Sequence, residues 1–177
     1  LPVCNLPAAF GRTLAHFAAS DRSAFAEIWD PDAGHCDPLS CDELGLTLYH
    51  VAAKSGNCDI LQKLLSPDVL AQWNYEAALA IDMRSRKGLS ALHLAAKGRY
   101  NACAKLLLKE KAMVDATNAQ GQTALHYAVN AAETDKEERV SDLTKWQAEW
   151  VAKTLLGAGA DPLLQDKSGV TPMHTAC

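Results

Sequence analysis

Apolar residues recur along the chain in pairs of short segments with helical spacing. In the most regular copy, the first segment spans residues 92–96, and Ser90 precedes it as a side chain suited to the position before a helix. The second segment presents an apolar face made of Cys103, Ala104, Leu107 and Leu108. Positions three and four residues apart are typical of a helix with one buried face. The pattern predicts two short helices, followed after Val114 by an extended finger.

One six-residue phrase opens five copies of this unit, at residues 11–16, 45–50, 88–93, 121–126 and 169–174. Every copy begins with glycine and ends with histidine, and the opening glycines are 34, 43, 33 and 48 residues apart. A period of about 33 residues predicts a stack of small repeated units. We expect each glycine to relieve a backbone strain that a Cβ atom would aggravate.

The phrase resembles the Thr-Pro-Leu-His turn of the ankyrin repeat, most closely at Thr171-Pro172-Met173-His174 and in the stretch from Gly88 to Asp115. The resemblance implies an all-α ankyrin-repeat solenoid with short β-hairpin fingers. It also implies that the repeated histidines join neighbouring loops and helices through hydrogen bonds, so a structural role is favoured over catalysis or metal binding; they are His16, His50, His93, His126 and His174. The repeats fall at about 8–41, 42–84, 85–117, 118–165 and 166–177, the last one incomplete.

Two repeats are longer than the period. The surplus in repeat two lies at about 66–80, where Ser66-Pro67-Asp68 is a helix-start signal, so we expect one added short helix near the finger.

The surplus in repeat four lies at about 131–147. Its second helix is expected to be extended at the N-terminal end, with core positions at Val151, Ala152, Leu155 and Leu156. Further apolar residues precede them at helical spacing: Val140, Leu143, Trp146 and Trp150. We expect the tryptophans to pack on repeats three to five rather than to form an exposed binding site.

Composition narrows the possible functions. The chain has 177 residues, is 49% hydrophobic, carries a formal net charge of -4 and has a pI of about 5.8. An acidic protein lacks the basic stripe expected for binding nucleic acid, and no apolar run approaches the length that crosses a bilayer. Because the chain begins at Leu1 and ends within repeat five, we expect it to be part of a longer protein. We also expect it to be a monomer.

Six cysteines in a chain with a large core suggest reduced thiols in an intracellular compartment, cytoplasmic or nuclear. The only cluster with ligand chemistry is His35, Cys36 and Cys41, to which Cys58 could add a fourth zinc ligand. Its spacing differs from that of common zinc sites, so an ordinary loop is favoured over a zinc or thiol sensor. No phosphate-binding glycine loop or nucleophile motif occurs, and no metal, cofactor or enzymatic activity is expected of this segment.

The resemblance places partner-binding positions beside the opening glycines and after the paired alanines. They are Glu43, Leu44, Leu46, Lys54, Ser55, Arg84, Arg86, Lys87, Leu89, Lys97, Thr117, Ala119, Gln120, Gln122, Asn130, Gln165, Lys167 and Ser168. Within this set, Arg84, Arg86 and Lys87 form a basic tip, which is either a solvated turn or a site for an acidic peptide or protein surface. The expected function is a non-enzymatic protein-protein interaction module. The alternative is a regulatory or targeting arm of a larger enzyme, channel or secreted effector.

Overall fold

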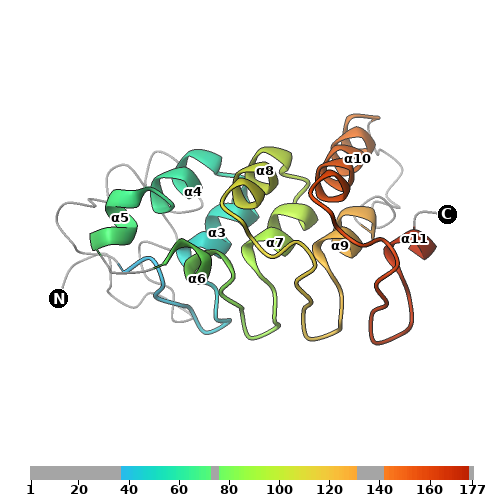
Figure 1. Ribbon diagram of the computed structural model, residues 1–177, viewed down its shortest axis with the longest axis horizontal. Coiled ribbons are helices and arrows are strands. Elements are labelled where there is room, and N and C mark those ends of the chain that lie inside the picture. The colour runs from blue at the N-terminus through green and yellow to red at the C-terminus, as the bar shows by residue number, and fades with distance from the viewer. Residues whose placement is uncertain (1–36, 73–75, 131–141, 176–177) are drawn as a thin grey trace.

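The computed structural model describes residues 37–72, 76–130 and 142–175, and its helices form two layers above a row of fingers (Figure 1). The first helices of successive repeats pack side by side in one layer; they are α3 (Leu48–Ser55), α7 (Ala91–Lys97), α9 (Ala124–Asn130) and α11 (Pro172–Thr175). The second helices form the other layer and are α4 (Cys58–Leu64), α8 (Asn101–Lys109) and α10 (Asp142–Gly157). This arrangement is the predicted solenoid. Repeat one, as predicted at about 8–41, lies almost entirely outside the described residues.

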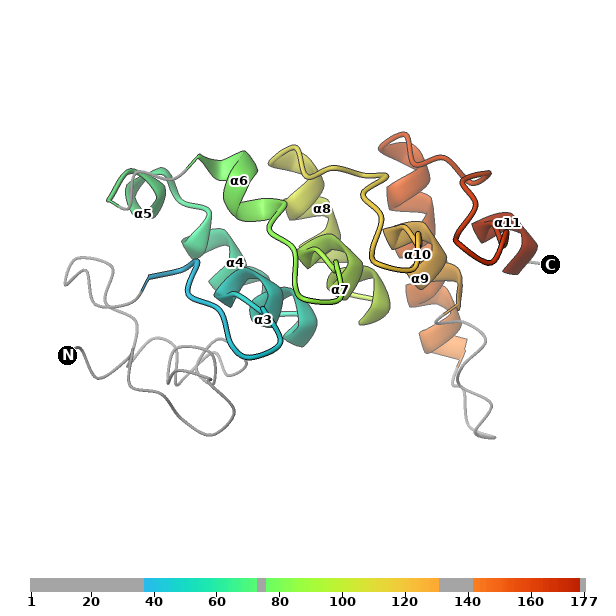
Figure 2. The ribbon, with the colours of Figure 1, turned by 90° about the horizontal axis from the view of Figure 1, so that it is seen from below.

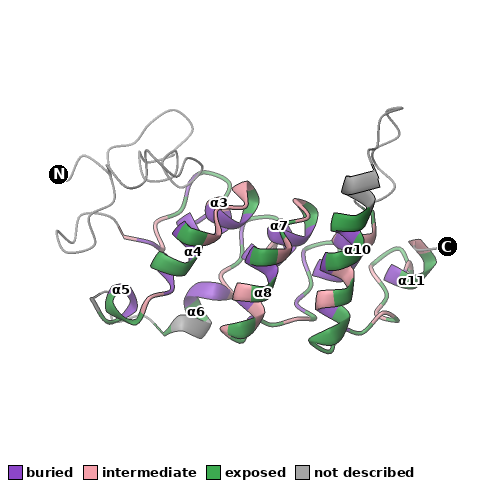
Figure 3. Cartoon of the chain, turned by 90° about the horizontal axis from the view of Figure 1, so that it is seen from above, coloured by how far each residue is buried: buried purple, intermediate pink, exposed green. Residues whose placement is uncertain are grey.

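The core lies between the two layers, where buried faces of neighbouring helices meet (Figure 3). Paired alanines let the first helices approach closely, and Ala52, Ala53, Ala95 and Ala96 are fully buried. Tyr49 is also fully buried, and its hydroxyl donates to the carbonyl oxygen of Leu64 at 2.9 Å. This bond joins the two helices of repeat two without leaving a buried polar group unpaired.

The second helix of repeat three follows the predicted pattern. Cys103, Ala104 and Leu107 are fully buried, while Leu108 is half-buried against the same core. The helical spacing thus located the buried face of α8 correctly.

Each finger is shaped by a polar residue three positions before the opening glycine. The Asn118 side-chain oxygen accepts hydrogen bonds from the backbone of Gln120 and Gln122, at 2.8 and 2.9 Å. Asp42 and Asp166 make the equivalent pairs of bonds in their own fingers, and the Ser85 hydroxyl accepts one from Leu89. Asn, Asp and Ser side chains favour turns through such local bonds.

The fingers are hairpin-shaped loops, and the described residues contain no β-strand. In the finger of repeat three, the backbone amide of Ser85 donates to the carbonyl oxygen of Leu89, and the amide of Gly88 donates to the carbonyl oxygen of Ser85. These two bonds close the loop, and no longer ladder follows. The predicted β-hairpins are therefore turns in the described fingers, closed by a few backbone hydrogen bonds rather than by a ladder of paired strands.

The insertion of repeat two contains two short helices where one was predicted, α5 (Pro67–Gln72) and α6 (Ala77–Ile81). α5 begins at the predicted helix-start signal and buries Val69 and Leu70. α6 buries Ala80 and Ile81. A five-residue helix is too short to display a period, which is why the sequence pattern did not separate the second helix from the first.

The second helix of repeat four is extended, as predicted: α10 has 16 residues, whereas α8 has 9. The prediction that its tryptophans pack on neighbouring repeats was wrong for Trp146 and Trp150, which are 61% and 56% exposed. α10 instead buries Ala148, Val151 and Leu155, whose spacings of three and four define its inner face.

Residues at other positions of the α10 turn point away from that face, toward the outside of the stack. Leu156 is accordingly 46% exposed, although it was predicted in the core, whereas Ala152 is half-buried and packs against the core as predicted. The predicted position Val140 lies outside the described residues, as does the side chain of Leu143.

None of the helices in the described ranges is both long enough and apolar enough to cross a bilayer.

Candidate protein-binding groove

The repeated histidines join each repeat to the next. In α7, the backbone amide of Ser90 donates to His93 Nδ1 at 3.2 Å, and the serine hydroxyl lies 2.8 Å from the same nitrogen. The other ring nitrogen, Nε2, lies 3.0 Å from the carbonyl oxygen of Gln122 in repeat four. One imidazole thus caps its own helix and contacts the finger of the following repeat.

Two other histidines repeat this arrangement. His50 Nε2 lies 2.9 Å from the Leu89 carbonyl, and His126 Nε2 lies 3.1 Å from the Val170 carbonyl. In both, Nδ1 accepts from the backbone amide of the preceding threonine. His174 makes the capping half of the arrangement with Thr171, and His16 lies outside the described residues. The structural role predicted for these histidines is confirmed for His50, His93 and His126.

The partners fix the protonation state of each ring. A backbone amide can only donate and a carbonyl can only accept, so Nδ1 must be bare and Nε2 must carry the proton. Burial favours the same neutral form: it lowers the pKa of His93 to about 4 and also lowers the pKa of His50. His50 and His93 are therefore neutral connectors at physiological pH.

Backbone hydrogen bonds also join adjacent fingers. The amide of Arg86 donates to the Leu44 carbonyl at 2.9 Å, and the amide of Ala119 donates to the Lys87 carbonyl at 3.1 Å. A further bond runs from Lys167 to Gln120. The fingers consequently form a connected row, visible from below in Figure 2.

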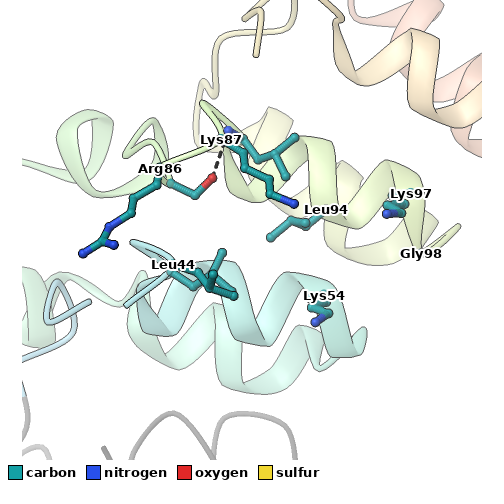
Figure 4. A pocket seen from close by; sticks show the side chains of 10 residues that line it. Leu44, Lys54, Arg86, Lys87, Leu94, Lys97 and Gly98 are labelled. Atoms are coloured by element: carbon teal, nitrogen blue, oxygen red, sulfur yellow. Dashed lines mark hydrogen bonds between the residues drawn. The ribbon is translucent and has the colours of Figure 1, made fainter. Parts of the chain in front are cut away.

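A groove of about 460 Å³ lies between repeats two and three, on the surface formed by the fingers and first helices. Its apolar residues are Leu44, Leu46, Leu89 and Leu94, and its cationic residues are Lys54, Arg86, Lys87 and Lys97. Figure 4 shows the Lys87 side chain extending toward Leu94, with Lys54 and Lys97 together at the ends of α3 and α7. The Arg86 side chain extends away from them at the opposite end of the groove.

The described charged residues of the groove are all positive. All four cations are exposed, and within the described part of the chain none of the four has an ion-pair partner. None of the described residues that line the groove is acidic. The arrangement can therefore accept apolar side chains on its floor and carboxylates at its edges.

Seven of the predicted partner-binding residues converge on this groove: Leu44, Leu46, Lys54, Arg86, Lys87, Leu89 and Lys97. The other lining residues are Ser85, Leu94 and Gly98, which were not in the predicted set. Leu94 was missed because its place within the α7 pattern marked it as core, and it is indeed only 7% exposed. Ser85 could have been identified from the sequence, because it lies in the finger three residues before the opening glycine Gly88.

The remaining predicted positions lie outside the groove. Most of them are exposed on the fingers or at helix ends, and Ser55 and Gln122 are half-buried; the exposed ones are Glu43, Arg84, Thr117, Ala119, Gln120, Asn130, Gln165, Lys167 and Ser168. Their role in binding stays a prediction.

The three residues of the predicted basic tip have two different roles in the structure. Arg86 and Lys87 line the groove, whereas Arg84 Nη1 donates to the Thr117 carbonyl at 2.7 Å and to the Gly88 carbonyl at 3.2 Å. Arg84 therefore joins the fingers of repeats three and four, so a solvated turn does not describe this residue.

Replacing Arg84 by alanine should lower the free energy of unfolding by about 1 kcal/mol, because the bonds to the next finger are lost. Arg86→Ala is the matched control and should change it by less than about 0.5 kcal/mol. Urea unfolding of both variants measures the difference. Equal effects would show that the Arg84 bonds contribute nothing to stability.

Of the four candidate zinc ligands, the structure describes Cys41 and Cys58, whereas His35 and Cys36 lie outside the described residues. Cys41 is exposed, and the Cys58 sulfur lies 2.6 Å from that of Cys103, an arrangement that the sequence did not reveal. Across the described ranges, no three His, Cys, Asp or Glu side chains are grouped so as to hold a metal ion.

Comparison with known proteins agrees with this architecture. The family model for ankyrin repeats in three copies matches residues 70–138. Neurogenic locus notch homolog protein 1 from Danio rerio is 31% identical over 130 residues, covering 63% of this chain and 5% of that protein. The transient receptor potential channel pyrexia from Drosophila melanogaster is 33% identical over 142 residues, covering 80% of this chain and 12% of the channel.

A third relative, the nuclear factor NF-kappa-B p105 subunit from Gallus gallus, is 31% identical over 136 residues, covering 76% of this chain and 12% of the subunit. The chain therefore spans only a small part of the length of these relatives. Their matches, together with the helix pairs and fingers, show that this chain belongs to the ankyrin-repeat family, whose arrays are generally protein-protein interaction modules.

Proposed function

We propose that this array is a non-enzymatic module that binds a partner protein through its finger and first-helix surface, with the groove between repeats two and three at the centre of the interface. The observation that carries the proposal is the convergence of seven predicted residues on one groove with an apolar floor and cationic edges. The proposed compartment is intracellular, where Cys41, Cys58 and Cys103 would remain free thiols.

The chemistry of the groove selects its partner. Leu44 is 52% exposed, so an apolar side chain bound there would remove hydrocarbon surface from water. The four cations would attract carboxylates, accelerate association and orient the bound segment. We therefore propose that the partner presents an acidic segment that contains an apolar side chain.

Charge reversal in the groove should weaken binding of such a segment by about 10- to 100-fold. The test begins with selection of a random displayed peptide library on the full chain, which should enrich acidic peptides with an aliphatic or aromatic residue. Binding of the enriched peptides is then measured by surface plasmon resonance for the wild type and for a variant combining Arg86→Glu, Lys87→Glu and Lys97→Glu. The loss should appear mainly as slower association, and the remaining binding should depend less on salt.

The matched control combines Lys63→Glu, Lys105→Glu and Lys109→Glu. These lysines are exposed on the second helices of the same two repeats, so the net charge changes equally while the groove stays intact. Equal weakening by both variants, or selection of peptides without acidic residues, would contradict the proposed site.

A second proposal is that the array acts as a regulatory or targeting arm of a larger enzyme, channel or secreted effector. It is favoured by the coverage of the relatives: the pyrexia channel matches this chain over only 12% of its length. In either case, the same groove would be the contact surface.

A further inference from the structure

Two free cysteines face each other across the layer of second helices. Cys58 is the first residue of α4, and Cys103 lies in the first turn of α8, 45 positions later in the sequence. These helices belong to neighbouring repeats and pack against each other. The two sulfur atoms are 2.6 Å apart, so they need to approach by only about 0.5 Å to reach the length of a disulfide bond.

The two thiols differ in their access to solvent. Cys103 is fully buried, and burial, together with the hydrogen bond to Cys58, raises the pKa of its thiol. Cys58 is only half-buried, so it is the more accessible residue of the two. An oxidant dissolved in water would therefore meet Cys58 first, and Cys103 would react only with a group already on Cys58.

We propose that Cys58 and Cys103 form a modification site at which a peroxide generates a disulfide between repeats two and three. The Cys58 sulfur attacks one peroxide oxygen, the O–O bond breaks, and a sulfenic acid forms with release of one water. The Cys103 sulfur then attacks the Cys58 sulfur, the S–O bond breaks, and the departing hydroxide takes the thiol proton as a second water. Hydrogen peroxide is reduced to two waters, and the two thiols are oxidised.

The disulfide would join α4 to α8 behind the groove. It would restrict the unfolded chain by closing the segment between the two cysteines, so oxidation should raise the melting temperature by at least about 5 °C. A reductant such as dithiothreitol should reverse the increase.

The experiment exposes the full chain to hydrogen peroxide, blocks the remaining thiols with N-ethylmaleimide under denaturing conditions and maps the peptides by mass spectrometry. We expect a linked peptide containing Cys58 and Cys103, a mass loss equal to two hydrogen atoms, and two fewer blocked thiols. A Cys41→Ser variant should behave like the wild type, which shows that the exposed cysteine takes no part.

Two further variants separate the steps. In Cys103→Ala, the sulfenic acid on Cys58 should persist and be captured by dimedone. In Cys58→Ala, Cys103 should remain unmodified. The proposal is overturned if wild-type Cys58 accumulates a sulfenic or sulfinic acid while Cys103 stays free, if neither cysteine reacts, or if the disulfide joins other cysteines.

Discussion

Lowering the pH from 7 to 4 should reduce the free energy of unfolding by about 3 kcal/mol through His93 alone. Burial lowers the pKa of this imidazole from 6.5 in the unfolded chain to about 4 in the folded one. Below pH 6.5 the unfolded chain therefore binds a proton that the folded chain does not, and stability falls with pH. The full contribution is present above pH 6.5 and is lost between pH 6.5 and 4.

The geometry explains why the folded protein resists this proton. Protonation would place a hydrogen on Nδ1, which already faces the backbone amide of Ser90. Two donors would then point at each other in a buried site, so the capping bond would break. Acid should thus act first on the cap of α7, because Nε2 can still donate to the Gln122 carbonyl after protonation.

Urea unfolding at a series of pH values, for the wild type and for His93→Ala, measures this contribution. At pH 7 the variant should be less stable by about 1 to 3 kcal/mol, because the amide of Ser90 and the carbonyl of Gln122 lose their partner. Since the variant cannot titrate at this position, only the wild type loses about 3 kcal/mol by pH 4, so the difference should vanish or reverse in sign there. Parallel pH profiles would show that His93 is not the titrating group.

Replacing Gly88 by alanine should reduce the free energy of unfolding by about 2 to 4 kcal/mol. Gly88 has a φ of +73°, in the left-handed region that a Cβ atom disfavours. An added Cβ would also lie 2.7 Å from the backbone nitrogen of Ala119 in the next finger. That nitrogen donates to the Lys87 carbonyl, so the substitution disturbs a bond between two repeats.

Gly169→Ala is the matched control. Its φ of +77° imposes a similar backbone strain, but apart from its chain neighbours no described residue has an atom within 4 Å of the added Cβ. We expect a loss of about 1 kcal/mol there. Equal losses in the two variants, measured by urea unfolding, would mean that the contact between fingers is unimportant and that backbone strain explains the whole effect.

The sequence predicted those parts of the fold that depend on a repeated local pattern. Helix pairs, capping residues and opening glycines recur in every regular unit, so each copy supports the interpretation of the others. The insertions have no such support. α6 is too short to show a period, and the tryptophans of α10 share the helical spacing of its core residues while lying on another side of the helix.

The candidate site was predicted from matching positions in the repeats, which select residues but do not show how they are arranged in space. Matching positions between repeats brought Leu44 and Lys87 into one set, but the sequence could not show that they line the same groove. It also could not separate Arg84 from Arg86, because the difference depends on the position of the Thr117 carbonyl in another finger. Likewise, the pairing of Cys58 with Cys103 depends on how two helices of different repeats are aligned.

The connecting histidines all use main-chain carbonyls of the following repeat as acceptors, and those carbonyls belong to Leu89, Gln122 and Val170. A carbonyl oxygen is present whatever side chain the residue carries, and here a leucine, a glutamine and a valine serve equally well. Two of these residues are predicted to face the partner. Their side chains can therefore diverge in evolution, or be exchanged by a protein engineer, to change binding specificity without altering the attachment between repeats.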